Sequence, residues 1–391
     1  MTPADERATA AHPATHAANV PIPRNIVIPM VAGIGNALMA EPLARQLRAA
    51  MPHDGNLTVV AMTRPMGEPF ARIRGVKVVI AGRGALKMFA ALRAAAPIDL
   101  LLVPFPSNRW QYNVLAMRSG ARRAIMHGYP AGARAWLSGV VAERVEAVRG
   151  LHDVNQNLRL LEPLGIRPRL DDPPRFPLDK HDRTRADDLL RDAGIDRKPF
   201  IAVHAGSART LLAAAKRWPA ANYAALIAAL RSATGWPVAL LEGPDEPGVA
   251  GEILNAAAPV DPEAAPVIRL VGPLGEAAAL LARAKLYVGT DSGLAHLASA
   301  VGTRAVTLFA PADPTRVCPF GQGDLVVKPE KPCSPCFLYP WEATHPKMRC
   351  RPPFCVTEIT VEQVMRRVAA ALALPGGSTV GSDQPSLGTN R

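Results

Sequence analysis

The residues best suited to chemistry stand together near residue 290. An apolar run ends at Val288, and the turn Gly289-Thr290-Asp291-Ser292-Gly293 then leads into a helical pattern. A turn of this kind between a strand and a helix leaves backbone N–H groups at the helix N-terminus, where they and the helix dipole attract an anion. Ser292 and His296 are four residues apart and share one face of the first helical turn. The stretch predicts a phosphate-binding turn. The plainer interpretation is an N-cap at Asp291 or Ser292 and a packed His296.

Three other short segments carry polar groups next to apolar runs. Lys216 opens Lys216-Arg217-Trp218-Pro219, Glu246 closes the turn Gly243-Pro244-Asp245-Glu246, and Gly33-Ile34-Gly35-Asn36 follows the first apolar run. Taken alone, Glu246 is equally well explained as a solvated turn carboxylate.

Parallel strands would bring these segments together. In the first half of the chain, apolar runs at 25–30, 57–62, 76–80 and 99–105 alternate with helical patterns at 37–50 and 112–120. In the second half, runs at 200–204, 237–241, 267–270, 286–289 and 305–309 alternate with helical patterns at 222–234, 276–284 and 293–301. Such alternation predicts parallel sheets covered on both faces. We therefore expect an α/β fold of two Rossmann-like domains, with ligands at the carboxyl ends of the strands.

Composition marks the expected limits of these domains. Residues 1–24 and 375–391 lack apolar periodicity and predict disordered tails. The segment 171–196 is rich in Pro, Asp and Arg and predicts a connection between domains. We expect an N-terminal domain over 25–180 and a C-terminal domain over 197–372.

Composition also excludes several classes of protein. The chain has 391 residues, of which 49% are hydrophobic, so wholesale disorder is excluded. Only 5% are aromatic, which argues against a nucleic-acid-stacking platform. There is no secretory leader and no apolar run long enough to span a membrane, so we expect a cytoplasmic protein. The net charge of +12 favours anionic partners, although an Arg- and Ala-rich composition explains it equally well.

The cysteines do not form a disulfide framework, but four of them lie close in sequence. Cys333, Cys336, Cys350 and Cys355 are spaced loosely like a structural zinc site. The alternative is a set of thiols in a Pro-rich loop. No Asp-x-Asp metal motif is present.

The stretch 286–311 resembles the nucleotide-sugar motif of glycosyltransferase family 9, the lipopolysaccharide heptosyltransferase family. Five more blocks follow that family's order, so that the resemblance extends over about 25–372. They are Gly33-Ile34-Gly35-Asn36 with Pro42, His152-Asp153-Val154-Asn155, Leu160 to Gly165, Val203 to Ser207 with Lys216 to Pro219, and Gly243 to Glu246.

The resemblance implies a GT-B enzyme with its two domains facing across a cleft. It implies inverting, metal-independent sugar transfer from a nucleotide-diphospho-sugar such as ADP-heptose to a lipid-linked glycan, at the inner face of the inner membrane. The acceptor would lie beside Gly33 and Gly35 of the N-terminal domain, and the last helix, near 360–372, would pack on that domain. The donor would bind in the C-terminal domain through Lys216, Glu246, Asp291, Ser292, Gly293 and His296.

One position departs from the family pattern. The family's opening G-x-G-D loop supplies an aspartate that acts as the general base, and Asn36 stands there in this chain. An amide cannot accept the acceptor's proton. Glu41, the nearest carboxylate, lies about 140° away around a helix and is a poor replacement.

Three alternatives follow. The chain could be a nucleotide-sugar or glycan binder that kept the fold and lost the base. Gly33-Ile34-Gly35 could begin a dinucleotide fingerprint, but Leu38 stands where the third glycine belongs. The turn at 289–293 could be a hydrolase elbow, but two residues, not one, separate its first glycine from the serine.

Overall fold

The computed structural model describes residues 21–129, 141–206, 215–256, 265–341 and 354–374. Most of the two predicted tails lies outside these ranges. The last residues of the first one, 21–24, are described: Ile22 packs against the core and Arg24 pairs with Asp54 at 3.1 Å.

The first sheet is a six-stranded parallel sheet in the order β3-β2-β1-β4-β5-β6. Its strands are β1 (Asn25–Met30), β2 (Asn56–Ala61), β3 (Val76–Ile80), β4 (Leu100–Leu102), β5 (Arg123–Gly128) and β6 (Glu143–Glu146). The helices around it include α1 (Ile34–Ala50), α2 (Arg64–Ala71), α3 (Ala85–Ala94), α4 (Trp110–Arg118) and α6 (Asp153–Arg159). Buried apolar clusters lie on both faces, as the continuous apolar runs predict.

The second sheet repeats the same plan with the order β12-β11-β10-β7-β8-β9. Its strands are β7 (Ile201–His204), β8 (Val238–Glu242), β9 (Val267–Arg269), β10 (Leu286–Thr290), β11 (Ala305–Leu308) and β12 (Val326–Val327). Its helices include α9 (Ala220–Thr234), α10 (Val249–Asn255), α11 (Leu274–Arg283), α12 (Gly293–Ala300), α13 (Pro314–Val317) and α14 (Val361–Leu372). Both sheets thus have the Rossmann strand order, which confirms the predicted pair of α/β domains.

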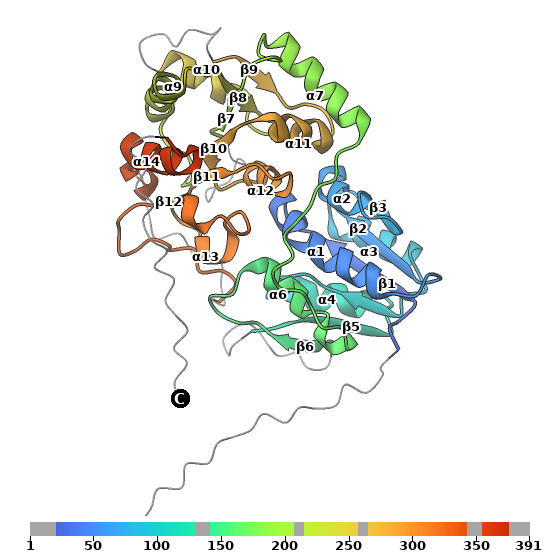
Figure 1. The fold of residues 1–391 in the computed structure, drawn as a ribbon. Helices are drawn as coiled ribbons and strands as arrows, with labels where there is room; N and C mark the ends of the chain where they lie inside the picture. Colours follow the sequence, from blue (N-terminus) through green and yellow to red (C-terminus); the bar gives the residue numbers. More distant parts are fainter. Residues whose placement is uncertain (1–20, 130–140, 207–214, 257–264, 342–353, 375–391) are drawn as a thin grey trace, which may run out of the picture.

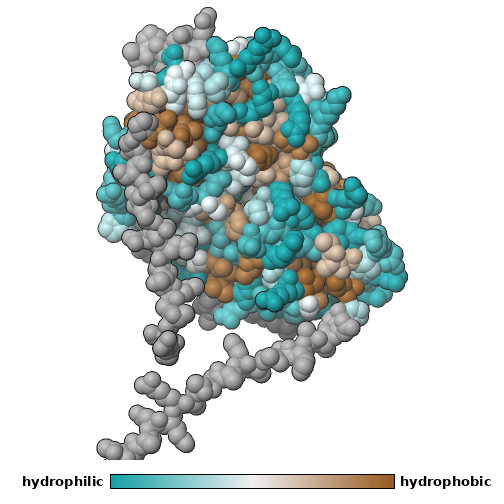
Figure 2. All heavy atoms as spheres, viewed as in Figure 1, coloured by the Kyte–Doolittle hydropathy of each residue, from teal (hydrophilic) through white to brown (hydrophobic). Residues whose placement is uncertain are grey.

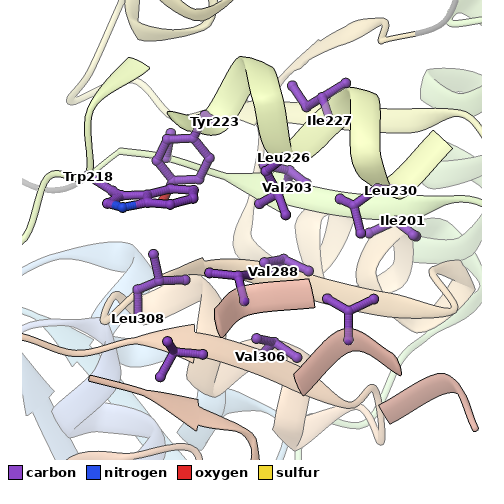
Figure 3. Close-up of a cluster of buried hydrophobic side chains, with 14 of the residues drawn as sticks. Ile201, Val203, Trp218, Tyr223, Leu226, Ile227, Leu230, Val288, Val306 and Leu308 are labelled. Carbon is purple, nitrogen blue, oxygen red and sulfur yellow. The ribbon is translucent and has the colours of Figure 1, made fainter. Parts of the chain in front are cut away.

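The final helix corrects the sequence-based expectation. We expected it on the N-terminal domain, but α14 packs on α9 and on β10, β11 and β12 of the second sheet. Its apolar stripe of Val364, Val368 and Ala371 belongs to the cluster that also holds Trp218 and Tyr223, and Figure 3 shows this cluster between α9 and the sheet. The face of β11 needs an apolar cover, and α14 supplies it.

The two domains touch along several lines. Leu38 of α1 is fully buried in an apolar cluster of the second domain, and α1 packs directly on α12 (Figure 1). Arg316 of α13 pairs with Asp153 of α6 at 2.6 Å, and both side chains are buried. The connection contains a helix that we did not predict, α7 (Lys180–Asp192), which packs on α11. The domain limits 25–180 and 197–372 remain predictions.

The face of the molecule drawn in Figure 2 is mainly hydrophilic, as expected of a folded globular chain. Figure 2 shows hydrophilic side chains over much of the α7 side, with hydrophobic residues gathered in separate patches. None of the described helices combines the length and the hydrophobicity that a membrane span requires.

Candidate functional site

The predicted donor residues gather where the second sheet reverses its strand order. The order reverses between β7 and β10, which are neighbours, with His204 opposite Gly289. Ligands of open α/β sheets bind at such switch points, at the carboxyl ends of the strands. The loops after β7, β8 and β10 therefore bring His204, Glu246 and Ser292 to one edge.

The turn between β10 and α12 was predicted to bind phosphate, and it ends at the N-terminus of α12. Ser292 is the N-cap residue of α12, yet its side chain does not cap the helix. Its hydroxyl instead lies 3.3 Å from Nδ1 of His204 and 3.3 Å from the Tyr287 hydroxyl. There is no acidic residue in the first turn of α12. Within the described ranges no side chain caps the α12 N-terminus by a hydrogen bond, a state that favours an anion.

Lys216 reaches this turn from a separate segment. Its Nζ lies 2.5 Å from Oδ2 of Asp291, and both side chains are largely buried. Trp218, two residues on, anchors the segment: its indole N–H donates to the Ile359 carbonyl at 2.8 Å and its ring packs edge-on against Tyr223. Because Trp218 is fixed in the core, Lys216 is held at the edge of the turn.

Glu246 faces inward rather than toward solvent. The Nε2–H of His204 donates to its carboxylate, and the Gly243 N–H donates to it at 3.3 Å. Burial disfavours the charged carboxylate, but the His204 bond and charge outweigh burial and lower the pKa of Glu246. A Cβ atom at Gly206 would lie 1.9 Å from this carboxyl group, so only glycine fits there. The interpretation of Glu246 as a solvated turn residue is therefore wrong.

His204 and Tyr287 are members of this cluster that the sequence did not single out. The Tyr287 hydroxyl lies 3.4 Å from Nδ1 of His204, and both residues are buried. His204 ends one apolar run and Tyr287 lies within another, and no local pattern joins them because 83 residues separate the two.

The opening loop of the N-terminal domain lies against the same helix. A Cβ atom at Gly293 would lie 3.1 Å from Cβ of Ile34, and one at Gly35 would lie 2.9 Å from Cδ2 of His296. Gly33 is the N-cap of α1, with no side-chain cap and no acidic residue in the first turn. The positive N-terminal ends of α1 and α12 therefore meet, an arrangement that an anion between them would stabilise.

Asn36 lies in the first turn of α1, at this junction, and is half-buried. The carboxylate of Glu41 is occupied by other partners: it pairs with Arg45 at 2.7 Å and accepts the Arg175 backbone N–H at 3.0 Å. The expectation that Glu41 is a poor substitute for a base at position 36 agrees with this pairing.

His296 is the buried histidine of the junction, and it faces the N-terminal domain. Burial lowers its pKa to about 4; Asp291 opposes this shift and Lys216 adds to it. The imidazole is therefore neutral at pH 7. Burial also lowers the pKa of His152 of the N-terminal domain to about 4, and the nearby His296 adds to that shift.

The cysteine set is only partly described. Cys318 and Cys355 are buried and Cys333 is exposed, whereas Cys350 lies outside the described residues. Among described residues no three His, Cys, Asp or Glu side chains are grouped as a metal site requires.

One open cavity lined by described residues lies away from the candidate site. It has a volume of about 690 Å³, lies at the far end of α1, and has several arginines in its lining, including Arg45, Arg48 and Arg72. None of the predicted site residues lines it.

Comparison with known proteins agrees with this geometry. The profile of glycosyltransferase family 9 (heptosyltransferase) matches residues 115–345, more than half of the chain. Lipopolysaccharide heptosyltransferase 3 of Escherichia coli is 29% identical over 212 residues, which cover 53% of this chain and 58% of that protein. The match thus spans little more than half the length of this curated relative.

Solved structures show the same fold over nearly the whole chain. The family 9 glycosyl transferase from Veillonella parvula has a TM-score of 0.69 at 18% identity and covers 91% of this chain and 99% of its own. E. coli ADP-heptose lps heptosyltransferase II has a TM-score of 0.65 at 20% identity, with 89% and 98% covered. E. coli heptosyltransferase WaaC with ADP has a TM-score of 0.60 at 17% identity, with 89% and 97% covered. Two Rossmann-like domains in the GT-B arrangement and a family profile over both halves lead to one conclusion: the chain belongs to glycosyltransferase family 9.

Proposed function

We propose that this protein transfers a sugar from a nucleotide-diphospho-sugar to a glycan, with inversion at the anomeric carbon and without a metal ion. The observation that carries the proposal is the meeting of two helix N-termini without side-chain caps, those of α1 and α12, beside Lys216. A diphosphate between them would satisfy both positive ends at once.

The donor roles follow from this geometry. Lys216 and the first-turn amides of α12, at Ser292 and Gly293, would neutralise the charge that develops on the departing nucleoside diphosphate. In this way Lys216 and the helix amides would take over part of the charge neutralisation that a divalent cation provides in metal-dependent enzymes. Glu246 would turn from His204 to accept a ribose hydroxyl, and Asp291 would hold Lys216 in place. Because structural relatives are described with ADP and as ADP-heptose enzymes, we propose ADP-heptose as the donor class.

The acceptor would enter from the N-terminal domain, beside Gly33 and Gly35. Its hydroxyl would attack the anomeric carbon on the face opposite the diphosphate, and a single displacement of this kind inverts the configuration. The relative named lipopolysaccharide heptosyltransferase 3 supports a lipid-linked glycan as the acceptor. The transfer would then take place at the inner face of the inner membrane.

Asn36 favours a second candidate. A family member whose base is replaced by an amide could bind a sugar nucleotide or glycan without transferring the sugar. Binding experiments alone do not separate this binder from an enzyme, so turnover must be measured as well.

Calorimetry with ADP, followed by a transfer assay in excess EDTA, tests the proposal. We expect saturable ADP binding to the wild type and transfer that EDTA does not reduce. ADP binding with no transfer to any glycan acceptor would support the binder instead. Absence of ADP binding would refute the donor site, and loss of transfer on chelation would refute the metal-independent mechanism.

A further inference from the structure

We propose that His296 is the general base of the transfer reaction in this chain. The inference rests on the proposed function. The reaction needs a group that accepts the acceptor's proton, and the family's position for that group holds Asn36. Asn36 cannot do so, because an amide has no basic lone pair at neutral pH.

Four carboxylates around the junction of α1 and α12 are already engaged. Each accepts hydrogen bonds from a cation, an imidazole or an amide that would have to be displaced before the carboxylate could take a proton. They are Glu41 with Arg45, Asp153 with Arg316, Glu246 with His204, and Asp291 with Lys216.

His296 differs from these groups in position and in partners. Its ring lies against the first turn of α1, which carries Asn36: a Cβ atom at Gly35 would lie 2.9 Å from the ring Cδ2 and 3.3 Å from the ring Nε2. Its ring nitrogens have no hydrogen bond to any residue within the described ranges. It also lies one turn along α12 from Ser292, so one helix presents both the diphosphate cradle and the ring.

Burial keeps the His296 ring neutral. The charge of Asp291 favours the imidazolium, and that of Lys216 disfavours it. Burial is the larger influence, and the resulting pKa of about 4 is close to that of an ordinary aspartate, the residue His296 would replace in function.

The step balances as follows. In the tautomer protonated on Nδ1, the Nε2 lone pair accepts the hydroxyl proton of the acceptor. The acceptor oxygen forms its bond to the anomeric carbon, and the bond from that carbon to the diphosphate oxygen breaks. The electron pair leaves on the nucleoside diphosphate beside Lys216, and the imidazolium then releases its proton to water.

The experiment combines two substitutions. His296→Asn is expected to lower kcat by about 10²- to 10⁴-fold, the usual worth of a general base, and to leave ADP affinity within a few-fold. Adding Asn36→Asp to that variant restores a carboxylate at the family's position and should recover much of the lost rate. His53→Asn removes an exposed histidine far from the junction and serves as the control. Should His296→Asn fail to fold, His296→Gln replaces it.

The outcomes separate the two claims. Unchanged kcat in the His296 variant would overturn the assignment and leave the transferase proposal standing. Parallel losses of kcat and ADP affinity would make His296 a donor ligand, and failure of Asn36→Asp to rescue would also overturn its role as base. If the wild type neither binds ADP nor transfers sugar, the proposed function fails and the assignment fails with it.

Discussion

Replacing Lys216 by alanine is the sharpest perturbation of the donor site. Its Nζ lies 2.5 Å from Asp291, and only 19% of the lysine and 9% of the aspartate side chain are exposed. The substitution removes one charge-assisted bond to the diphosphate, worth about 1.5–3 kcal/mol. It also leaves Asp291 as an unpaired anion beside the α12 N-terminus, which pushes the loss toward the upper end of that range. ADP affinity should therefore fall by about 10- to 150-fold.

Calorimetry at one fixed ionic strength measures the change in ADP affinity. Two further variants serve to identify its cause. Lys331→Ala is the matched control, since Lys331 pairs with Glu358 at the same 2.5 Å but both side chains are 45% exposed. It should leave ADP affinity unchanged. Adding Asp291→Asn to Lys216→Ala removes the unpaired anion and should recover part of the loss. Unchanged ADP affinity in Lys216→Ala would refute the assignment of Lys216 as a phosphate ligand.

The other predictions concern stability, pH, the membrane and metal. Asp153→Ala breaks the buried pair with Arg316 and should lower the free energy of unfolding by about 3–5 kcal/mol in urea titrations; a loss below about 1 kcal/mol would show that the pair does not hold the domains. Burial lowers the pKa of His127 to about 3 and those of His152 and His296 to about 4, so these rings resist protonation in the folded state. Their contribution to stability is complete above the unfolded pKa near 6.5 and is lost as the pH falls toward 4, by about 1.4 kcal/mol per pH unit for each proton; equal stability in urea at pH 7 and pH 5 would contradict this. Sedimentation with anionic vesicles should show binding that salt weakens, through exposed cations such as Arg74, Lys77, Arg118 and Arg122, and a wholly unbound protein at low salt would refute the membrane proposal. Elemental analysis of purified protein decides the cysteine set: one zinc per chain would support a structural site, and none would leave thiols in a loop.

Much of the fold was predictable because parallel strands buried on both faces read as continuous apolar runs. The runs that became β1, β3 and β10 began at the predicted residue, Asn25, Val76 and Leu286. The short β4 was overextended, since only Leu100–Leu102 pairs in the ladder. The helix α7 was missed because its charged sequence carries little apolar periodicity, and its packing on α11 depends on few residues.

The parts of the site that lie within one short segment could be predicted from the sequence. The contacts between residues far apart in the sequence could not. The turn at Asp291, Ser292 and Gly293 is local, so its place between a strand and a helix could be predicted from the sequence. The bond between His204 and Glu246 joins residues 42 apart, and that between His204 and Ser292 joins residues 88 apart. The apolar stripe of α14 predicted that one face of the helix is buried, but it could not indicate which domain that face covers.

The central claim is that the junction of α1 and α12 catalyses sugar transfer, and product analysis tests it most directly. The purified protein is incubated with ADP-heptose and a lipopolysaccharide core acceptor, and the product is examined by mass spectrometry and by NMR of its anomeric carbon. We predict an acceptor that has gained one heptosyl unit, with the anomeric configuration inverted relative to the donor, and a loss of product in Lys216→Ala. Retained configuration would contradict the single-displacement mechanism. Bound ADP with an unmodified acceptor, across a panel of nucleotide sugars and glycans, would contradict the transferase assignment itself.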